Sequence, residues 1–85
     1  MTLSIRWEAR GARDRDNLDN VTRARVLAAI ERFAASGHGD IRALRGHVGE
    51  YRLRVGDWRV RFALDAARSE LIVLGVRHRR EAYRD

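Results

Sequence analysis

The residues with the clearest chemical potential are four arginines in a segment that predicts a β-hairpin. Residues 51–62 alternate apolar and basic side chains on both sides of Gly56-Asp57. A Gly-Asp pair between two alternating runs is typical of a two-residue hairpin turn, because Gly supplies the positive φ. With this turn, successive side chains take opposite faces, and the arginines form two pairs that oppose each other directly. These pairs are Arg52 with Arg61 and Arg54 with Arg59.

An arginine surface of this kind has two interpretations. Like charges opposed across strands destabilise a sheet, so the simpler one is a solvated surface whose repulsion water and salt screen. The sharper one is an anion-binding platform, because a guanidinium stays charged and its planar fork matches phosphate oxygens. The other face of the hairpin is apolar and predicts a contact with the core. It carries Tyr51, Leu53, Val55, Trp58, Val60 and Phe62.

Composition favours a polyanionic partner. The 85-residue chain is predicted to be a single domain over residues 1–85, and its net charge is +6. Residues 42–85 contain eleven arginines and six acids, whereas residues 1–41 contain seven arginines and six acids. This basic half suggests nucleic acid as the first class of partner and an acidic protein segment as the second.

Several function classes find no support in the sequence. There is no cysteine, and His38 and His47 lie in Gly-flanked loops without a paired ligand, so we expect neither a metal site nor another cofactor. No stretch has the length and hydrophobicity of a signal peptide or a membrane span. We therefore expect a cytoplasmic protein without membrane contact.

The hydrophobic pattern predicts an α+β fold. The order of elements gives a strand, two helices and then a three-stranded antiparallel meander, with the helices packed on one face of a mostly antiparallel sheet. Candidate N-caps at residues 19–22 and a stop at Gly37 bound the longer helix. Gly75 interrupts the last strand and indicates a bulge or a close backbone approach. The predicted ranges are a strand at 3–7, helices at 8–18 and 20–36, a loop at 41–50, hairpin strands at 51–64 and a strand at 71–76.

This order gives the arginines a direction. The longer helix must bury its apolar stripe, and the apolar face of the hairpin is the obvious partner, so the arginines face away from the helices. The last strand delivers Arg77, His78 and Tyr83 to its own end. If that strand neighbours the hairpin, these three side chains lie beside the arginines. Arginine binds phosphate, tyrosine stacks on a base and histidine titrates near neutral pH, which are the properties of an RNA site.

At these residues the sequence resembles the RelE/ParE superfamily of toxins from bacterial toxin–antitoxin modules. The matching stretches are GEYRLRVGDWRVRFAL and VLGVRHRREAYR, and the resemblance extends over nearly the whole chain. The match is closer to the RelE branch, whose members cleave mRNA, most typically in the ribosomal A site. The implied reaction is metal-independent endoribonuclease cleavage that leaves a 2′,3′-cyclic phosphate and a 5′-hydroxyl.

The resemblance also implies roles for single residues. Arg59 matches an arginine that holds the scissile phosphate, and Arg77 matches one that stabilises transition-state charge at the leaving oxygen. Tyr83 matches a terminal tyrosine that stacks on a substrate base. Five other arginines of the two matching stretches are expected to bind substrate. These are Arg52, Arg54, Arg61, Arg79 and Arg80.

The general base is the point at which this sequence departs from the family pattern. The positions of Arg52 and Arg54 are often lysine in the best-known RNA-cleaving members, and this chain contains no lysine. A guanidinium does not readily release a proton in a protein, so neither arginine is a good base. On chemical grounds His78 is the better group for proton transfer, with Glu81 or Glu50 behind it.

The resemblance implies partners as well. A cognate antitoxin would cover the arginines with an acidic, partly disordered segment, mRNA and the ribosome would be the targets, and operator DNA would be bound only through the antitoxin complex. Two alternatives remain open. One is a ParE-like toxin that inhibits DNA gyrase without cleaving RNA, and the other is a degenerate toxin that retains only antitoxin binding.

Overall fold

The computed structural model describes residues 2–82 and contains five strands and three helices within that range. No helix among these residues is both long and apolar enough to cross a lipid bilayer. The predicted α+β class is confirmed, as is the order of a strand and two helices before the antiparallel strands; these strands number four rather than three, and a short helix follows them within the described residues. The elements are β1 (Ser4–Trp7), α1 (Ala9–Asp16), α2 (Asn20–Ser36), β2 (Asp40–Ala43), β3 (Glu50–Val55), β4 (Trp58–Asp65), β5 (Glu70–His78) and α3 (Arg79–Ala82).

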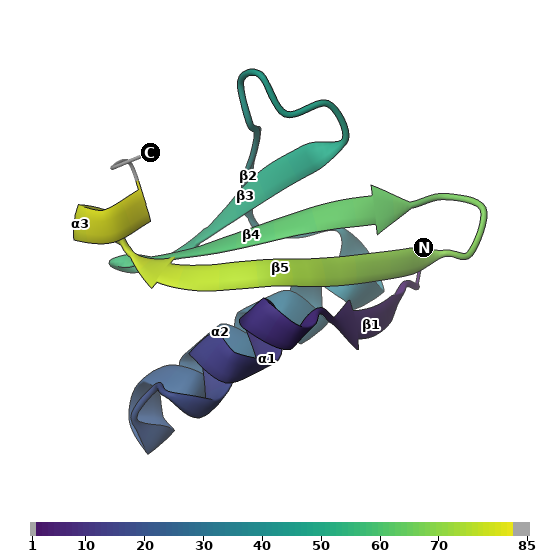
Figure 1. The fold of residues 1–85 in the computed structure, drawn as a ribbon. Helices are drawn as coiled ribbons and strands as arrows, with labels where there is room; N and C mark the ends of the chain where they lie inside the picture. The colour runs from purple at the N-terminus through teal and green to yellow at the C-terminus, as the bar shows by residue number, and fades with distance from the viewer. Residues whose placement is uncertain (1, 83–85) are drawn as a thin grey trace.

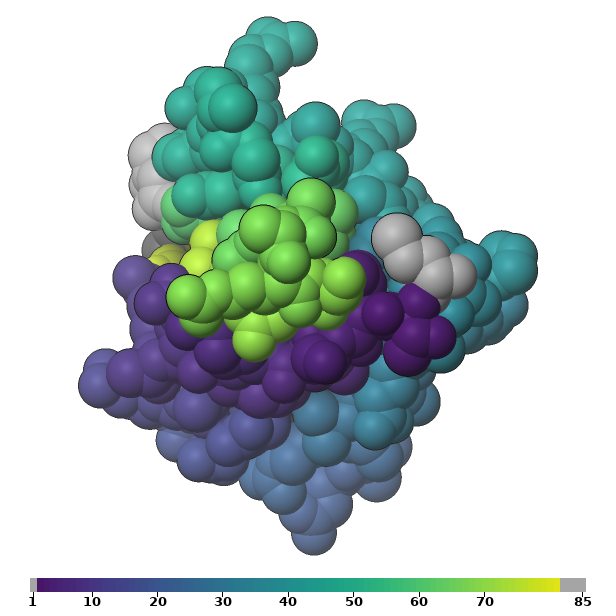
Figure 2. Space-filling model, turned by 90° about the vertical axis from the view of Figure 1, so that its right-hand side faces the viewer, coloured from purple at the N-terminus to yellow at the C-terminus, as the bar shows by residue number. Residues whose placement is uncertain are grey.

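The strands form one sheet in the order β1-β5-β4-β3-β2. Strands β2 to β5 pair antiparallel, and β1 adds to β5 in parallel. Figure 1 shows α1 and α2 together on one side of the sheet, with α3 beyond the end of β5 and away from them. Seen from the β4–β5 turn, the helical layer in purple and blue lies below the sheet, and the β2–β3 loop in teal rises above it (Figure 2).

One segment predicted as loop is a strand. Residues 41–50 were expected to be irregular, but β2 pairs antiparallel with β3 through Ile41 opposite Leu53 and Ala43 opposite Tyr51. Four residues with one partly buried apolar side chain give almost no periodicity, so only pairing with the neighbouring strand identifies β2. The irregular segment is confined to residues 44–49.

The longer helix begins and ends at the residues that the sequence indicated. The Asp19 side chain accepts a hydrogen bond from the Thr22 backbone N–H at 3.2 Å, which satisfies one of the first free donors of α2. At the other end Gly37 takes φ 79°, and its N–H donates to the Phe33 carbonyl. Between these caps the helix buries Val26, Ile30 and Ala34 against the sheet.

Phe62 lies at the centre of the core. It is fully buried, and its ring packs at 5.3 Å from the Phe33 ring and 5.6 Å from the Tyr51 ring. Each large apolar side chain removed from water in this way contributes about 1.5–3 kcal/mol. Trp7 and Trp58 pack partly buried against the same core, as expected. The other fully buried large side chains are Ile30, Leu53, Leu71, Val26, Val60 and Val73.

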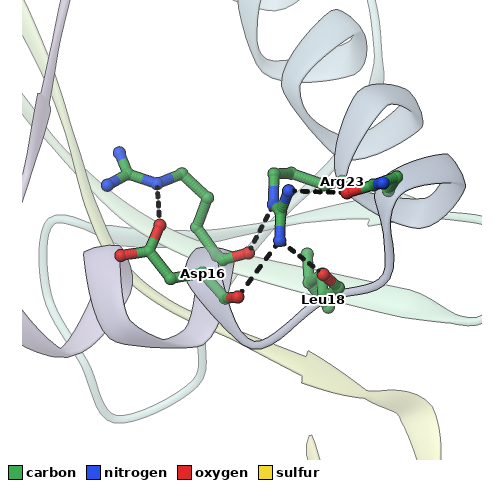
Figure 3. A network of polar contacts seen from close by, with 5 residues as sticks. Asp16, Leu18 and Arg23 are labelled. Atoms are coloured by element: carbon green, nitrogen blue, oxygen red, sulfur yellow. Dashed lines mark hydrogen bonds and ion pairs between the residues drawn. The ribbon is translucent and has the colours of Figure 1, made fainter.

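The corner between α1 and α2 is fixed by one arginine (Figure 3). The Arg23 guanidinium donates to the backbone carbonyls of Arg15 and Asp16, each at 3.1 Å, and of Leu18 at 2.7 Å. Two of these carbonyls belong to the last turn of α1, where no intrahelical N–H group is available to donate to them. Arg23 therefore caps α1 from α2 and sets how α1 lies against the sheet.

Helix α1 continues the edge of the sheet where β1 ends. Strand β1 covers β5 only from Glu70 to Val73. Beyond it, the Glu8 N–H donates to the Val73 carbonyl at 3.0 Å, and the Val76 N–H donates to Asp14 Oδ2 at 2.9 Å. The backbone of β5 is thus satisfied by a helix as far as the residue that precedes Arg77.

Candidate functional site

The predicted hairpin register is confirmed, and both of its arginine pairs extend into neighbouring strands. Arg52 opposes Arg61 and Arg54 opposes Arg59 across β3 and β4. Directly opposed residues lie on the same face of a sheet, so the pairs grow into two rows that cross the strands. The first row is Arg42, Arg52 and Arg61, and the second is Arg54, Arg59 and Arg77. We call these six residues the arginine face.

The arginine face points away from α1 and α2, as expected. The residues that alternate with the arginines, among them Leu53, Val60 and Val76, are buried in the core. Because neighbours along a strand take opposite faces, the arginines occupy the side without these helices. The sequence pattern does not predict Arg42 as part of this face, because residues 41–50 are expected to be a loop. The Asp-Ile-Arg-Ala alternation at 40–43 is the one local signal that could have indicated it.

A β-bulge brings Arg77 to this face. Arg61 opposes Gly75 while Phe62 opposes Val73, so Leu74 has no partner on β4. An uninterrupted register would place Arg77 opposite Trp58, on the core face, because a one-residue slip reverses every side chain. With the bulge, Arg77 opposes Arg59 directly. The interpretation of Gly75 as a bulge marker is confirmed, and the neighbouring Val76 is the residue that Asp14 binds.

Two carboxylates accompany the six arginines. Glu50 Oε1 accepts from Arg61 Nε at 2.7 Å and lies 2.5 Å from Arg61 Nη2. Asp40 lies 3.0 Å from Arg54 Nε and 3.9 Å from Arg52 Nη1. The face is therefore strongly positive, but several of its guanidinium groups already have an anionic neighbour.

Arg59 is held at the hairpin turn. Its Nη1 donates to the Gly56 carbonyl at 2.9 Å and to the Trp58 carbonyl at 3.0 Å. Gly56 takes φ 59°, the left-handed conformation expected of the first turn residue. Arg59 directly opposes Arg77 on β5, and these are the two arginines that the family resemblance assigns to the scissile phosphate and the leaving oxygen.

His78 lies on the other side of the sheet. It opposes Trp58, and the two rings meet edge to face at 5.3 Å between centroids. His78 also lines a cleft of about 330 Å³ whose wall includes Asp14, Asn17 and Glu81. The structure thus brings His78 and Glu81 together in a cleft that Arg77 also lines, while the register places His78 opposite Trp58 and not opposite Arg59. The role of His78 in proton transfer stays a prediction.

The remaining predicted residues lie at or beyond the end of β5. The Arg79 N–H donates to the Asp57 carbonyl at 2.7 Å, and its guanidinium lies 3.9 Å from the Asp57 carboxylate, so the start of α3 is tied to the hairpin turn. Arg80 is exposed. Tyr83 lies outside the described residues.

Another imidazole lies closer to the arginine face. His47 Nδ1 is 3.8 Å from Glu50 Oε1, the atom that also binds Arg61. The sequence pattern does not predict this contact, because only the conformation of the loop at 44–49 brings the imidazole to Glu50. Glu50, by contrast, was predicted as a group that could support proton transfer, and it does lie on the arginine face.

The fold is that of known toxins. A chain of the RelB–RelE antitoxin–toxin complex from Methanococcus jannaschii matches with a TM-score of 0.75 and 22% identity, over 92% of this chain and 94% of that chain. A chain of the archaeal RelE–RelB complex from Pyrococcus horikoshii OT3 matches with a TM-score of 0.77 and 20% identity, over 96% and 100%. The RelBE2 complex from Mycobacterium tuberculosis gives 0.75 and 21%, over 92% and 99%.

The sequence comparisons identify the family. Among curated proteins no sequence matches this chain. The family model described as the ParE toxin of the type II toxin–antitoxin system, parDE, matches residues 5–83, which include both hairpin strands and β5. This chain belongs to the ParE toxin family of type II toxin–antitoxin systems, within the RelE/ParE superfamily.

Proposed function

We propose that this toxin is an mRNA endonuclease that binds RNA on the arginine face and cleaves it on the ribosome, which stops translation. The single observation that carries the proposal is the direct opposition of Arg59 and Arg77 across β4 and β5. Two guanidinium groups on adjacent strands approach one phosphate from two sides. Their mutual repulsion favours an anion between them, because a phosphate is attracted to both guanidinium groups at once.

The reaction requires charge stabilisation above all. The ribose 2′-hydroxyl attacks the neighbouring phosphorus, the bond to the 5′-oxygen breaks, and the products are a 2′,3′-cyclic phosphate and a 5′-hydroxyl. Arg59 would hold the nonbridging oxygens and Arg77 would neutralise the leaving oxygen. A fixed donor at such a position contributes roughly 10²–10³ in rate. Neither step requires a metal ion.

A proton acceptor and a proton donor complete the chemistry. On the described part of the arginine face the titratable carboxylates are Asp40 and Glu50, and Glu50 is bound to Arg61. His78, on the opposite side of β5, would need to rotate away from Trp58 to reach substrate. The ribosome would supply positioning, which lowers what the protein itself must provide.

A cognate antitoxin is the second partner that we propose. The similar chains come from toxin–antitoxin complexes, and the arginine face suits an acidic, partly disordered segment. A cleft of about 470 Å³ between α2 and β3 adds apolar surface from Ala28, Ala29 and Leu53 with arginines at its rim. An acidic segment with apolar anchors would match both. Operator DNA would then be bound through the antitoxin.

The test is cleavage of mRNA by purified protein with ribosomes, read by primer extension. We expect Arg59→Ala and Arg77→Ala each to lower the cleavage rate about 10²–10³-fold. The matched control is Arg68→Ala, which removes the same charge from the exposed β4–β5 turn and should cleave like the parent protein. Cleavage by Arg77→Ala at the parent rate would sink the proposal.

Inhibition of DNA gyrase is a second candidate function. It is favoured by the family model, which describes ParE toxins, and by arginine at the two positions where RNA-cleaving relatives often carry lysine. DNA damage with intact mRNA after induction would support this candidate. If expression without an antitoxin failed to arrest growth, a degenerate toxin that only binds its antitoxin would be the better description.

A further inference from the structure

Asp40 places a carboxylate at the end of the second arginine row. It is the first residue of β2 and opposes Arg54 directly. One oxygen, Oδ2, lies 3.0 Å from Arg54 Nε, and the other, Oδ1, lies 3.9 Å from Arg52 Nη1. Two arginines that are two residues apart on β3 therefore converge on one anionic group.

The carboxylate satisfies one of these arginines only. The Arg52 side chain is 13% exposed, and its Nη1 is buried with no hydrogen-bond partner among residues 2–82. A buried guanidinium N–H without a partner is costly, and an oxygen at 3.9 Å is too far to accept it. An anion that replaces the Asp40 carboxylate would need oxygens that accept hydrogen bonds from both arginines.

A phosphate group meets this requirement. Its oxygens point toward the corners of a tetrahedron, so one phosphate can accept from Arg54 with one oxygen and from Arg52 with another. A carboxylate is planar and presents two oxygens on one side. Asp40 is about half exposed, and exposed ion pairs are weak, so its side chain can turn into solvent at small cost.

We propose that Asp40 is an internal counterion that fills a phosphate-binding site formed by Arg52 and Arg54, and that RNA must displace it. This rests on the proposed function in that the natural phosphate belongs to RNA. The consequence is selectivity. When an isolated anion binds, it replaces the weak ion pair with Asp40 by another weak ion pair. A polyanion that also contacts Arg59 and Arg77 gains additional contacts, and these favour displacement of Asp40.

The first experiment measures affinity with Asp40→Asn. The probe is a single-stranded RNA with 2′-O-methyl riboses, which cannot be cleaved, and the readout is fluorescence anisotropy. We expect Asp40→Asn to bind roughly two- to fivefold more tightly, the range that corresponds to losing one exposed competing ion pair. Asp65→Asn is the matched control, because it changes the same charge in the Asp65–Arg68 pair at the β4–β5 turn.

The sign of the change decides between two roles. If Asp40 instead orients Arg54 for substrate, Asp40→Asn weakens binding. If only net charge matters, Asp40→Asn and Asp65→Asn tighten binding equally. Either result overturns the proposal. In the Arg54→Gln background the gain from Asp40→Asn should fall well below its value in the parent protein, and an undiminished gain would also contradict it.

A second probe separates this inference from RNA cleavage. Inorganic tripolyphosphate is titrated while the Arg54 Nε–H signal is followed by NMR, which requires neither RNA nor enzymatic activity. Tighter binding by Asp40→Asn than by Asp65→Asn supports the phosphate site even if the protein proves not to cleave RNA. Equal binding by both variants refutes the site even if cleavage is observed.

Discussion

Replacement of Gly11 by alanine tests how closely α1 lies against the sheet. Gly11 is buried in α1, and a Cβ atom at this position would lie 2.5 Å from the Val73 carbonyl oxygen and 3.1 Å from the carbonyl carbon. Both are backbone atoms of β5, so no side-chain rotation relieves the contact. The same carbonyl accepts the Glu8 N–H, and a shift of α1 would lengthen that bond.

Two effects of opposite sign set the magnitude. Within a helix, alanine is more favourable than glycine by about 1 kcal/mol. Overpacking a tight contact costs about 1–3 kcal/mol, and a backbone obstacle belongs to the upper part of that range. We expect a net loss of about 1–2 kcal/mol in the free energy of unfolding. For a domain of 60–100 residues this lowers Tm by roughly 4–16 °C.

Urea denaturation and thermal melting of Gly11→Ala provide the measurement. Ala24→Gly, on the exposed side of α2, is the companion variant, because it reports the glycine penalty of this protein without a contact. If Gly11→Ala raised Tm by about the amount that Ala24→Gly lowers it, helix propensity alone would govern the site. That result would contradict the close contact between α1 and β5.

Three further variants test single contacts. Asp14→Ala leaves the Val76 N–H unpaired and should cost about 1–3 kcal/mol, whereas Asp14→Asn keeps an acceptor and should cost less; urea denaturation and hydrogen exchange at Val76 distinguish them. Hydrogen bonds from the side chain and then the backbone of Thr22 lower the pKa of Asp19. That stabilisation is therefore complete above the unfolded carboxyl pKa of about 3.9 and is lost as pH falls through the lower folded pKa. The Tm difference between the parent and Asp19→Ala should be constant from about pH 5 to 8 and shrink toward about pH 2; a difference that persists in acid would exclude the carboxylate cap. Phe62→Ala removes the most central ring and should lower the free energy of unfolding by about 3–5 kcal/mol. In thermal melting, the expected result is loss of the cooperative unfolding transition near room temperature.

The sequence by itself determined the local features of this protein. Alternation around Gly56-Asp57 was enough to specify the hairpin register, since the two strands adjoin in the chain and the turn fixes their pairing. Asp19 and Gly37 marked the ends of α2 for a similar reason, because a cap acts within one helical turn. These signals need no knowledge of distant residues.

The extension of the arginine face was decided by the tertiary structure. Arg42 joins it because β2 pairs with β3, although its four residues have too little periodicity to reveal a strand. The bulge at Leu74 decides whether Arg59 opposes Arg77 or Val76, because an uninterrupted register would place Arg77 opposite Trp58. That bulge is supported by Asp14, which is 62 residues away from Val76 in the chain. The sequence identifies the arginines, but the pairing of strands that are distant in the chain determines which arginines lie on the same face.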